Sequence, residues 1–451
     1  MAMALPCHAQ DITNTANNWQ QYFAQISDYD DIENDNLENF YEQLNELSMS
    51  PINLNTATDD DLKLLTFLNA TQLEELTEYL DRYRPLRSIG ELSMIKSLDP
   101  LRIKLLQCFV YVGDEPKKDV FPSFKDLLKY GKNELVAAAR IPFYTREGDR
   151  NGYLGYRYKH WFRYSFKCGQ RLQVGITGTQ DAGEPFFSNA NSLGYDHYSY
   201  YAVVRQLGVL KALALGQYKL RFGAGLVMNT GFTLGKTSSL LMSTPANVIT
   251  ANTSRSDAYY LQGAAATISL GQHVEMTAFA SYRKIDATLN DDGSIKTILR
   301  TGYHRTISEM ERKHNASQAT TGGNIKWRNH GFDLGASLVY TTFDRDLSPD
   351  VSKTFRHIYP TGKSFMNGSI NYGFTSHLIN IKGETAINND GAIATLNSII
   401  WKTSKQLSLS AIQRFYSYRY FSLFSSAFSD GGEVQNESGM YVGASWTPAP
   451  R

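Results

Sequence analysis

The sequence has little of what several common classes of protein require. Its 451 positions contain no run of about 18 apolar residues, which excludes a membrane protein built from helices. The three cysteines, Cys7, Cys108 and Cys168, are too few for a disulfide framework or for four zinc ligands. Charged residues make up only 20% of the chain, and the composition excludes a collagen-like repeat, a coiled coil and a disordered chain.

The abundant residues favour β-structure. The chain holds 28 Tyr and 23 Phe, which suit strands, and 34 Gly, which suit turns. A formal net charge of +1 hides an asymmetry, because positions 1–62 hold twelve acidic residues and no Lys or Arg. Positions 63–451 therefore carry 45 basic and 32 acidic groups, a net of +13. We expect an acidic front region and a mildly basic body that are built differently.

The first fifty residues predict a leader in two parts. Residues 1–9, which end on His8-Ala9, resemble the cleavage end of a secretory signal peptide, so we interpret them as its remnant. A disordered start without a role is the alternative. Residues 10–50 are expected to form an acidic leader whose second half is an amphipathic helix over 35–50. The apolar stripe of that helix consists of Leu37, Phe40, Tyr41, Leu44 and Leu47.

Capping signals predict further short helices up to position 106. Thr58 stands before three aspartates and is expected to cap one helix, and a second helix is expected over 71–84. Ser88 and Glu91 have the spacing of a capping box and predict a third. A fourth is expected over 100–106.

These residues resemble a known module. The segments INLNTAT (52–58) and YLDRYRPLRSIGEL (79–92) are similar to the helix-hairpin-helix domain of competence DNA receptors. The resemblance implies a small all-α helix-hairpin-helix domain over 51–112. On this sequence the motif falls on Asn53, Leu54, Asn55, Thr56, Ala57, Phe67, Leu68 and Asn69.

The same resemblance makes DNA a candidate partner, but the residues favour a helical docking module. In the family, hairpin glycines let backbone N–H groups approach a phosphate. Here positions 66–69 contain no glycine, and the Cβ atoms of Phe67 and Asn69 are expected to block that approach. Residues 52–112 hold nine acidic and seven basic groups, so attraction to phosphates is weak. If DNA binds, the candidate contacts are Arg82, Arg84 and Arg87.

After a polar linker over 113–129, hydrophobicity alternates with a period of two residues. This pattern predicts strands with one apolar and one polar face. One example is the set Val274, Met276, Ala278, Ala280 and Tyr282. Aromatic residues gather at strand ends, as in the interfacial girdles of membrane barrels. They include Tyr198, Tyr200, Tyr201, Tyr259, Tyr260, Phe415, Tyr416, Tyr418, Tyr420 and Phe421.

Connection lengths favour a membrane barrel over the alternative, a soluble β-domain. Tight turns are expected near Gly169, Gly271, His330, His377 and Lys405. Long polar loops are expected over 181–197, 230–257, 290–316 and 344–363. Short and long connections that alternate along the chain are typical of outer-membrane barrels, although a tight turn at 388–391 interrupts the alternation. We therefore expect an antiparallel barrel of twelve to fourteen strands in residues 130–451.

The whole architecture resembles Gram-negative outer-membrane proteins that combine a helix-hairpin-helix region with a C-terminal barrel. The similar segments are Gly216–Lys236 and Arg300–Lys313. The family has no established catalytic residues to carry over. Two prolines, Pro448 and Pro450, lie where a closing strand is expected, so we predict an incomplete, unclosed barrel at this end.

No motif predicts catalysis, a cofactor or a metal. The segment 231–237 has one residue too few for a phosphate-binding loop, and 290–293 is half a calcium loop without its later glutamate. The nine histidines lack the close spacing of metal ligands, and no GxSxG elbow is present. Catalytic, cofactor-binding and metal residues are therefore all expected to be absent.

The sequence as a whole predicts an α + β multidomain protein in a Gram-negative outer membrane. A small all-α domain in the periplasm is followed by an antiparallel transmembrane β-barrel. The predicted function is non-enzymatic, as a channel or an assembly component, with outer-membrane lipid and an unknown periplasmic or membrane protein as partners. DNA binding or uptake through the helical domain is the alternative. A hydrolase using barrel loops is a third hypothesis, which no motif supports.

Overall fold

The chain is described by a computed structural model in two compact units, one before and one after position 120. The described residues are 19–25, 41, 44–45, 47–48, 51–57, 59–62, 64–68, 70–113, 125, 129, 131–169, 171–188, 191–231, 248–255, 260–352, 358–376, 378–404 and 406–446. The expected signal remnant lies outside these residues, and so do most of the helix over 35–50, most of the linker, and the capping residue Thr58.

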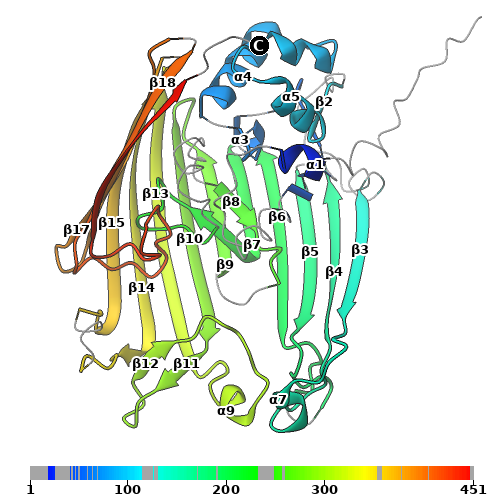
Figure 1. Cartoon of the computed structure of the whole chain (residues 1–451), viewed down its shortest axis with the longest axis vertical. Coiled ribbons are helices and arrows are strands. Elements are labelled where there is room, and N and C mark those ends of the chain that lie inside the picture. Colours follow the sequence, from blue (N-terminus) through cyan, green and yellow to red (C-terminus); the bar gives the residue numbers. More distant parts are fainter. Residues whose placement is uncertain are drawn as a thin grey trace, which may run out of the picture. The chain divides into compact units, whose positions relative to one another are not determined.

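The first unit consists of short helices and one pair of very short strands, drawn in blue in Figure 1. In chain order these are α1 (Trp19–Phe23), β1 (Ile52–Asn53), α3 (Asp59–Leu62), α4 (Ala70–Tyr83), the 3-10 helix η2 (Ile89–Met94), α5 (Pro100–Gln107) and β2 (Val110–Tyr111). None of the described helices has the length and hydropathy needed to span a membrane.

The expected helix signals are found in this unit. α4 buries Leu76 and Leu80 on one face, as the apolar spacing predicts. The Glu91 carboxylate accepts the backbone N–H of Ser88 at 3.0 Å, which is the predicted capping box, although it begins a 3-10 helix. α5 begins after Asp99, whose carboxylate accepts a backbone N–H one turn later.

The pair β1–β2 is a difference from the all-helical expectation. The two strands run parallel, with Ile52 opposite Val110. Ile52 is buried, so its backbone groups need partners, and its N–H donates to the carbonyl of Phe109 at 2.8 Å. The first and last segments of the unit are therefore joined by backbone hydrogen bonds that side-chain periodicity does not predict.

The second unit is one large antiparallel sheet with two short helices, α7 (Glu147–Arg150) and α9 (Ile307–Met310). Fourteen of its seventeen described strands have nine or more residues. The strands are β3 (Lys132–Arg140), β4 (Lys159–Cys168), β5 (Leu172–Gln180), β6 (His197–Leu207), β7 (Leu210–Arg221), β8 (Val248–Ala251), β9 (Leu261–Ser269), β10 (Val274–Ile285), β11 (Ala287–Leu289), β12 (Ile295–Ile298), β13 (Ala316–Asn329), β14 (Phe332–Leu347), β15 (Gly362–Thr375), β16 (Ile379–Asn388), β17 (Ile393–Lys402), β18 (Leu407–Tyr416) and β19 (Glu437–Trp446).

Each long strand pairs antiparallel with the next long strand along the chain (Figure 1). The strands are ordered as a closed barrel, in which β19 stands next to β3, so the expectation of an unclosed barrel is wrong. Among the described residues, however, no register pair joins these two strands. Neither of them contains a buried residue among those that the structure describes.

Short and long connections alternate along the sheet, as expected. The short turns are 169–171, 208–209, 270–273, 330–331, 376–378 and 403–406. The long connections are 141–158, 181–196, 222–260, 286–315, 348–361 and 417–436, and the tight turn 389–392 is the predicted exception. Because neighbouring strands are antiparallel, all the short turns lie at one edge of the sheet and the long connections at the other. The turn at 208–209 was not predicted.

The two faces of the sheet are inverted relative to a water-soluble protein. On β14 the exposed side chains are Phe332, Leu334, Ala336, Leu338 and Tyr340. The buried side chains that alternate with them include Ser337, Val339 and Thr341. Exposed apolar and buried polar side chains alternate in the same way on β10, β13, β15 and β16. The apolar face therefore points outward and the polar face inward.

The outward apolar band on β14 has the length of a membrane crossing. From Phe332 to Tyr340 the strand rises about 27 Å at about 3.4 Å per residue. Beyond this band the outer face becomes charged at Asp344. A tilted strand with an apolar band close to 25 Å tall is typical of outer-membrane barrels.

Candidate functional site

The motif asparagines of the helical unit are structural. Asn55 is buried, and its amide nitrogen donates to the carbonyls of Leu86 at 3.1 Å and Gly113 at 2.8 Å. Its side-chain oxygen accepts the Leu86 N–H at 2.7 Å. Asn53 accepts the backbone N–H groups of Asn55 and Gly113. Together the two side chains join three segments of the unit by hydrogen bonds.

The apolar motif residues form the core of the unit rather than a phosphate-binding surface. Leu54, Ala57 and Leu68 are buried, and Thr56 is exposed. Phe67 is only 2% exposed and its ring lies 5.1 Å from that of Phe109. The Cβ of Phe67 therefore lies in the interior of the unit. The sequence predicts instead that it obstructs the approach of a phosphate. Asn69 lies outside the described residues.

The three candidate DNA-contacting arginines do not form one surface group. The Arg84 guanidinium donates to the carbonyls of Leu54 at 2.9 Å and Ala57 at 2.6 Å, so it holds the motif segment in place. Arg82 and Arg87 have exposed side chains. The structure therefore separates one structural arginine from two exposed arginines that the sequence pattern grouped together.

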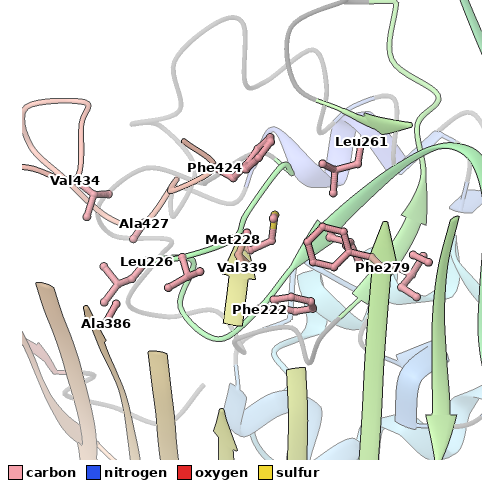
Figure 2. Packing of buried hydrophobic residues seen from close by; sticks show 14 of the residues in the cluster. Phe222, Leu226, Met228, Leu261, Phe279, Val339, Ala386, Phe424, Ala427 and Val434 are labelled. Atoms are coloured by element: carbon pink, nitrogen blue, oxygen red, sulfur yellow. The ribbon is translucent and has the colours of Figure 1, made fainter. Parts of the chain in front are cut away.

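In the second unit, two segments fold onto the inner, polar side of the sheet. They are residues 222–230, which follow β7, and the connection 417–436 between β18 and β19. Figure 2 shows Leu226 and Met228 of the first segment among the side chains of Val339, Ala386 and Phe424. Strands from distant parts of the sheet thus share one buried cluster on its inner side.

Polar contacts fix the two segments to each other and to the sheet. The Tyr420 hydroxyl donates to the carbonyl of Leu226 at 2.9 Å, and the Asn229 amide donates to that of Ser426 at 2.8 Å. Tyr420 and Tyr416 are buried at 0% and 2% exposure, so the expectation that they join an outer aromatic girdle is wrong. A long connection that folds inward carries its aromatic side chains into the interior.

Glu384 of β16 is the sheet residue that receives the first segment. One carboxylate oxygen accepts the N–H groups of Ala224 at 2.7 Å and Leu226 at 3.1 Å. Gly223 lies directly over this carboxylate, with φ of +53°. Glu384 is completely buried. A buried carboxylate is stabilised here by backbone donors of the segment that covers it.

A second polar cluster lies among the long connections. His304 Nδ1 is 2.5 Å from a carboxylate oxygen of Asp196, and its Nε2 is 2.8 Å from one of Asp286. The His304 backbone N–H donates to Glu184 at 3.0 Å. Lys313 Nζ binds the other oxygen of Asp196 at 2.6 Å. We refer to these five side chains as the loop-end cluster, because each comes from a connection at the long-loop edge.

The loop-end cluster has perturbed proton affinities because its groups are buried together. Burial and the charge of Asp196 raise the pKa of Glu184 to about 7. Burial alone would lower the pKa of His304, but its bonds to Asp196 and Asp286 outweigh burial and raise it to about 9. Burial opposes ionisation of Asp196, yet His304 and Lys313 hold its pKa below the usual value. A cluster of this kind can stabilise the loops or hold a cation.

No pattern in the sequence predicts the loop-end cluster. Its members are spread from Glu184 to Lys313, and His304 binds Glu184 across 120 positions. No short spacing of ligand types exists along the chain, so a search for motifs could not find them. The half calcium loop at 290–293 is a polar turn, as predicted, in which Asp292 accepts the Ser294 N–H at 2.8 Å. The segment 231–237 lies almost entirely outside the described residues.

Comparison with known proteins gives likeness of architecture only. No protein-family model and no curated protein matches this chain. An anion-selective porin from Comamonas acidovorans is 12% identical, with 70% of this chain and 99% of the porin covered, at a TM-score of 0.28. OmpF of Salmonella typhi, in complex with daunomycin, is 9% identical, with 70% and 95% covered, at 0.29.

An outer membrane protein of Vibrio cholerae, OmpT with its loop L8 deleted, is also similar. It is 8% identical, with 63% of this chain and 93% of that protein covered, at a TM-score of 0.26. Scores this low do not transfer a function to this chain.

Proposed function

We propose that this chain is a non-enzymatic β-barrel protein of a Gram-negative outer membrane. The observation that supports this most is the inverted sheet, with apolar side chains exposed and polar side chains buried. Alternate residues of a barrel strand face lipid, where apolar side chains are favoured, and the lumen, where polar ones are favoured. A soluble sandwich buries its apolar face instead.

The size of the exposed apolar surface supports the same proposal. Leu338 is 54% exposed, and large exposed side chains continue onto neighbouring strands at Ile325, Ile370 and Ile381. Extended apolar patches on a monomer in water are rare and mark contact with a membrane or another protein. We propose that lipid covers this surface.

Within this proposal the barrel has a blocked lumen. The segments 222–230 and 417–436 fill its inner side, fixed by Glu384 and by the contact between Tyr420 and Leu226. The protein is then a channel in a closed state, whose opening requires these segments to move. In the other form of the same proposal, the protein is an assembly component and the two segments are its fixed internal support.

We further propose that the helical unit is a periplasmic helix-hairpin-helix module that docks on a protein. The nine acidic and seven basic residues over 52–112 disfavour phosphate, and Arg84 is engaged by backbone carbonyls. DNA binding, the alternative, has two exposed arginines in its favour, Arg82 and Arg87.

The location is tested by membrane fractionation with gel mobility before and after boiling. A folded barrel stays compact in detergent at room temperature and runs differently once boiled, so heat-modifiable mobility in the outer-membrane fraction is expected. A soluble product with no shift in mobility would contradict the proposal.

Docking is tested separately, by deleting residues 10–112 from the full chain. Partners captured by crosslinking in the periplasm should be lost while the barrel keeps its heat-modifiable mobility. Full capture of every partner by the deletion variant would contradict the docking role. Duplex DNA that binds at physiological salt, and no longer binds after Arg82→Ala and Arg87→Ala, would favour the alternative.

A further inference from the structure

We propose that Glu184, Asp196 and His304 form a binding site for one divalent transition-metal ion at the long-loop edge of the sheet. One ligand atom from each of the three side chains lies within 4.8 Å of the others. Asp196 and His304 side chains are 4% and 2% exposed, and Glu184 is buried. Ligand atoms that converge from buried side chains indicate an ion site more strongly than exposed side chains that meet by chance.

The distances among these atoms suit one metal ion after small movements. Bonds of about 2.0–2.2 Å place two ligand atoms on a tetrahedral zinc roughly 3.4 Å apart. The 2.5 Å between His304 Nδ1 and the Asp196 oxygen must therefore open by about 1 Å, and the wider separations must shrink. All three side chains belong to connections rather than to paired strands, so such movement does not break the ladder.

The groups around the three ligands are arranged as a second layer of support. Asp286 accepts from His304 Nε2 at 2.8 Å, and a metal ion at Nδ1 would displace the proton that Nδ1 directs at Asp196. A metal-binding histidine usually donates its other ring N–H to a carboxylate in this way. Lys313 binds the second oxygen of Asp196 and leaves the first as a ligand. Each oxygen of Glu184 accepts one N–H and keeps a further lone pair.

The charge of the cluster favours a divalent ion. Three carboxylates, those of Glu184, Asp196 and Asp286, face a single ammonium group, that of Lys313. This leaves two negative charges among buried groups before His304 is counted. A divalent cation bound to a neutral imidazole balances them, and buried charge is tolerated when it is balanced.

The ligand set indicates the class of metal. Calcium and magnesium prefer oxygen ligands alone, whereas an imidazole nitrogen with carboxylates suits zinc, manganese, iron or cobalt. Zinc is the practical probe for affinity, and cobalt reports geometry through its visible absorption. The proposal is independent of whether the barrel conducts and of what the helical unit binds.

The test uses the full-length protein, folded in detergent and stripped with a chelator. Zn²⁺ is titrated against a chromophoric competitor, and we expect one ion per chain with no displacement by excess Ca²⁺ or Mg²⁺. His304→Gln and Asp196→Asn should abolish this binding. Asp286→Asn, which keeps all three ligands, should weaken it by about 10–100-fold. Glu309→Gln, in the same connection but bonded to Arg305, is the matched control and should not change it.

Heat-modifiable mobility of each variant shows that the barrel has folded before its metal affinity is compared. Bound Co²⁺ should give visible absorption that His304→Gln removes while Glu309→Gln retains it. Equal Zn²⁺ affinity in the wild-type chain and in folded His304→Gln and Asp286→Asn variants would overturn the proposal. The loop-end cluster would then be an internal charge network that fixes the loops without an ion.

Discussion

Glu384 and Leu226 lie 158 positions apart, yet a carboxylate oxygen of the first accepts the backbone N–H of the second at 3.1 Å. The same oxygen accepts the N–H of Ala224. This contact ties an inner-face residue of β16 to the segment that follows β7. Because both partners are buried, neither can exchange the bond for one to bulk water while the segment stays in place. The contact therefore decides where the segment lies.

Replacing Glu384 with Ala should release this segment. The N–H groups of Ala224 and Leu226 lose their acceptor, at a cost of about 1–3 kcal/mol for the buried one of Leu226. We expect higher single-channel conductance, or more frequent openings, in planar lipid bilayers. Thr385→Ala is the matched control, because its side chain is on the outer face of the same strand. Conductance that is equal in the two variants would show that this contact does not close the lumen.

The orientation of the sheet can be tested on the outer face of β14. Leu338→Arg places a charge in the middle of the apolar band and should destabilise a lipid-embedded barrel by about 2–4 kcal/mol. Asp344→Arg, on the same face but beyond the band, should cost little. The measurement is the fraction of each variant that folds into vesicles with heat-modifiable mobility. If Leu338→Arg folds as well as Asp344→Arg and becomes more soluble, the sheet does not face lipid.

The sequence predicts the parts of this protein that depend on neighbours in the chain. Alternation over 332–341 predicts a strand with two unlike faces. The pair Ser88 and Glu91, three positions apart, predicts the start of a helix. Both signals are local. Connection lengths are also read directly from the chain, which is why the short and long edges of the sheet could be expected.

The two polar sites could not be predicted, because their partners are distant in the chain. His304 and Glu184 are 120 positions apart, and neither belongs to a recurring motif. The sequence places Tyr420 in an outer girdle because aromatic residues favour membrane interfaces. The fold instead turns its connection inward, where the hydroxyl finds the Leu226 carbonyl. Side-chain chemistry alone does not indicate to which side of a barrel wall a connection folds.

Arg84 should stabilise the helical unit rather than bind a ligand. Arg84→Ala removes two hydrogen bonds from a charged donor to backbone carbonyls, each worth about 1.5–3 kcal/mol. Cys108 is a probe of this loss, because it is buried and burial raises the pKa of its thiol to about 11. With Cys7 and Cys168 changed to Ser, labelling of Cys108 at pH 8 should be at least about tenfold faster in Arg84→Ala.

Arg82→Ala is the control for this experiment, since the Arg82 side chain is exposed. Its labelling rate should equal that of the parent. A slow, parent-like rate in Arg84→Ala would mean that the two carbonyl contacts contribute little to the unit. The same two variants are also controls for the DNA-binding test. DNA binding that is lost only in Arg84→Ala reports unfolding of the helical unit and not a phosphate contact.

Gly223 should be needed for the close approach of the inner segment to Glu384. Its φ is +53°, which costs an L-residue about 1–2 kcal/mol, and an added Cβ would lie 2.9 Å from the Glu384 carboxylate. Gly208 separates the two effects, because it has a similar φ of +61° but no atom near an added Cβ. Gly223→Ala should therefore lower the unfolding temperature in detergent more than Gly208→Ala, and also raise conductance. If the two variants unfold at the same temperature, backbone strain alone explains the lower unfolding temperature of Gly223→Ala. The Glu384 carboxylate has then moved aside without releasing the segment.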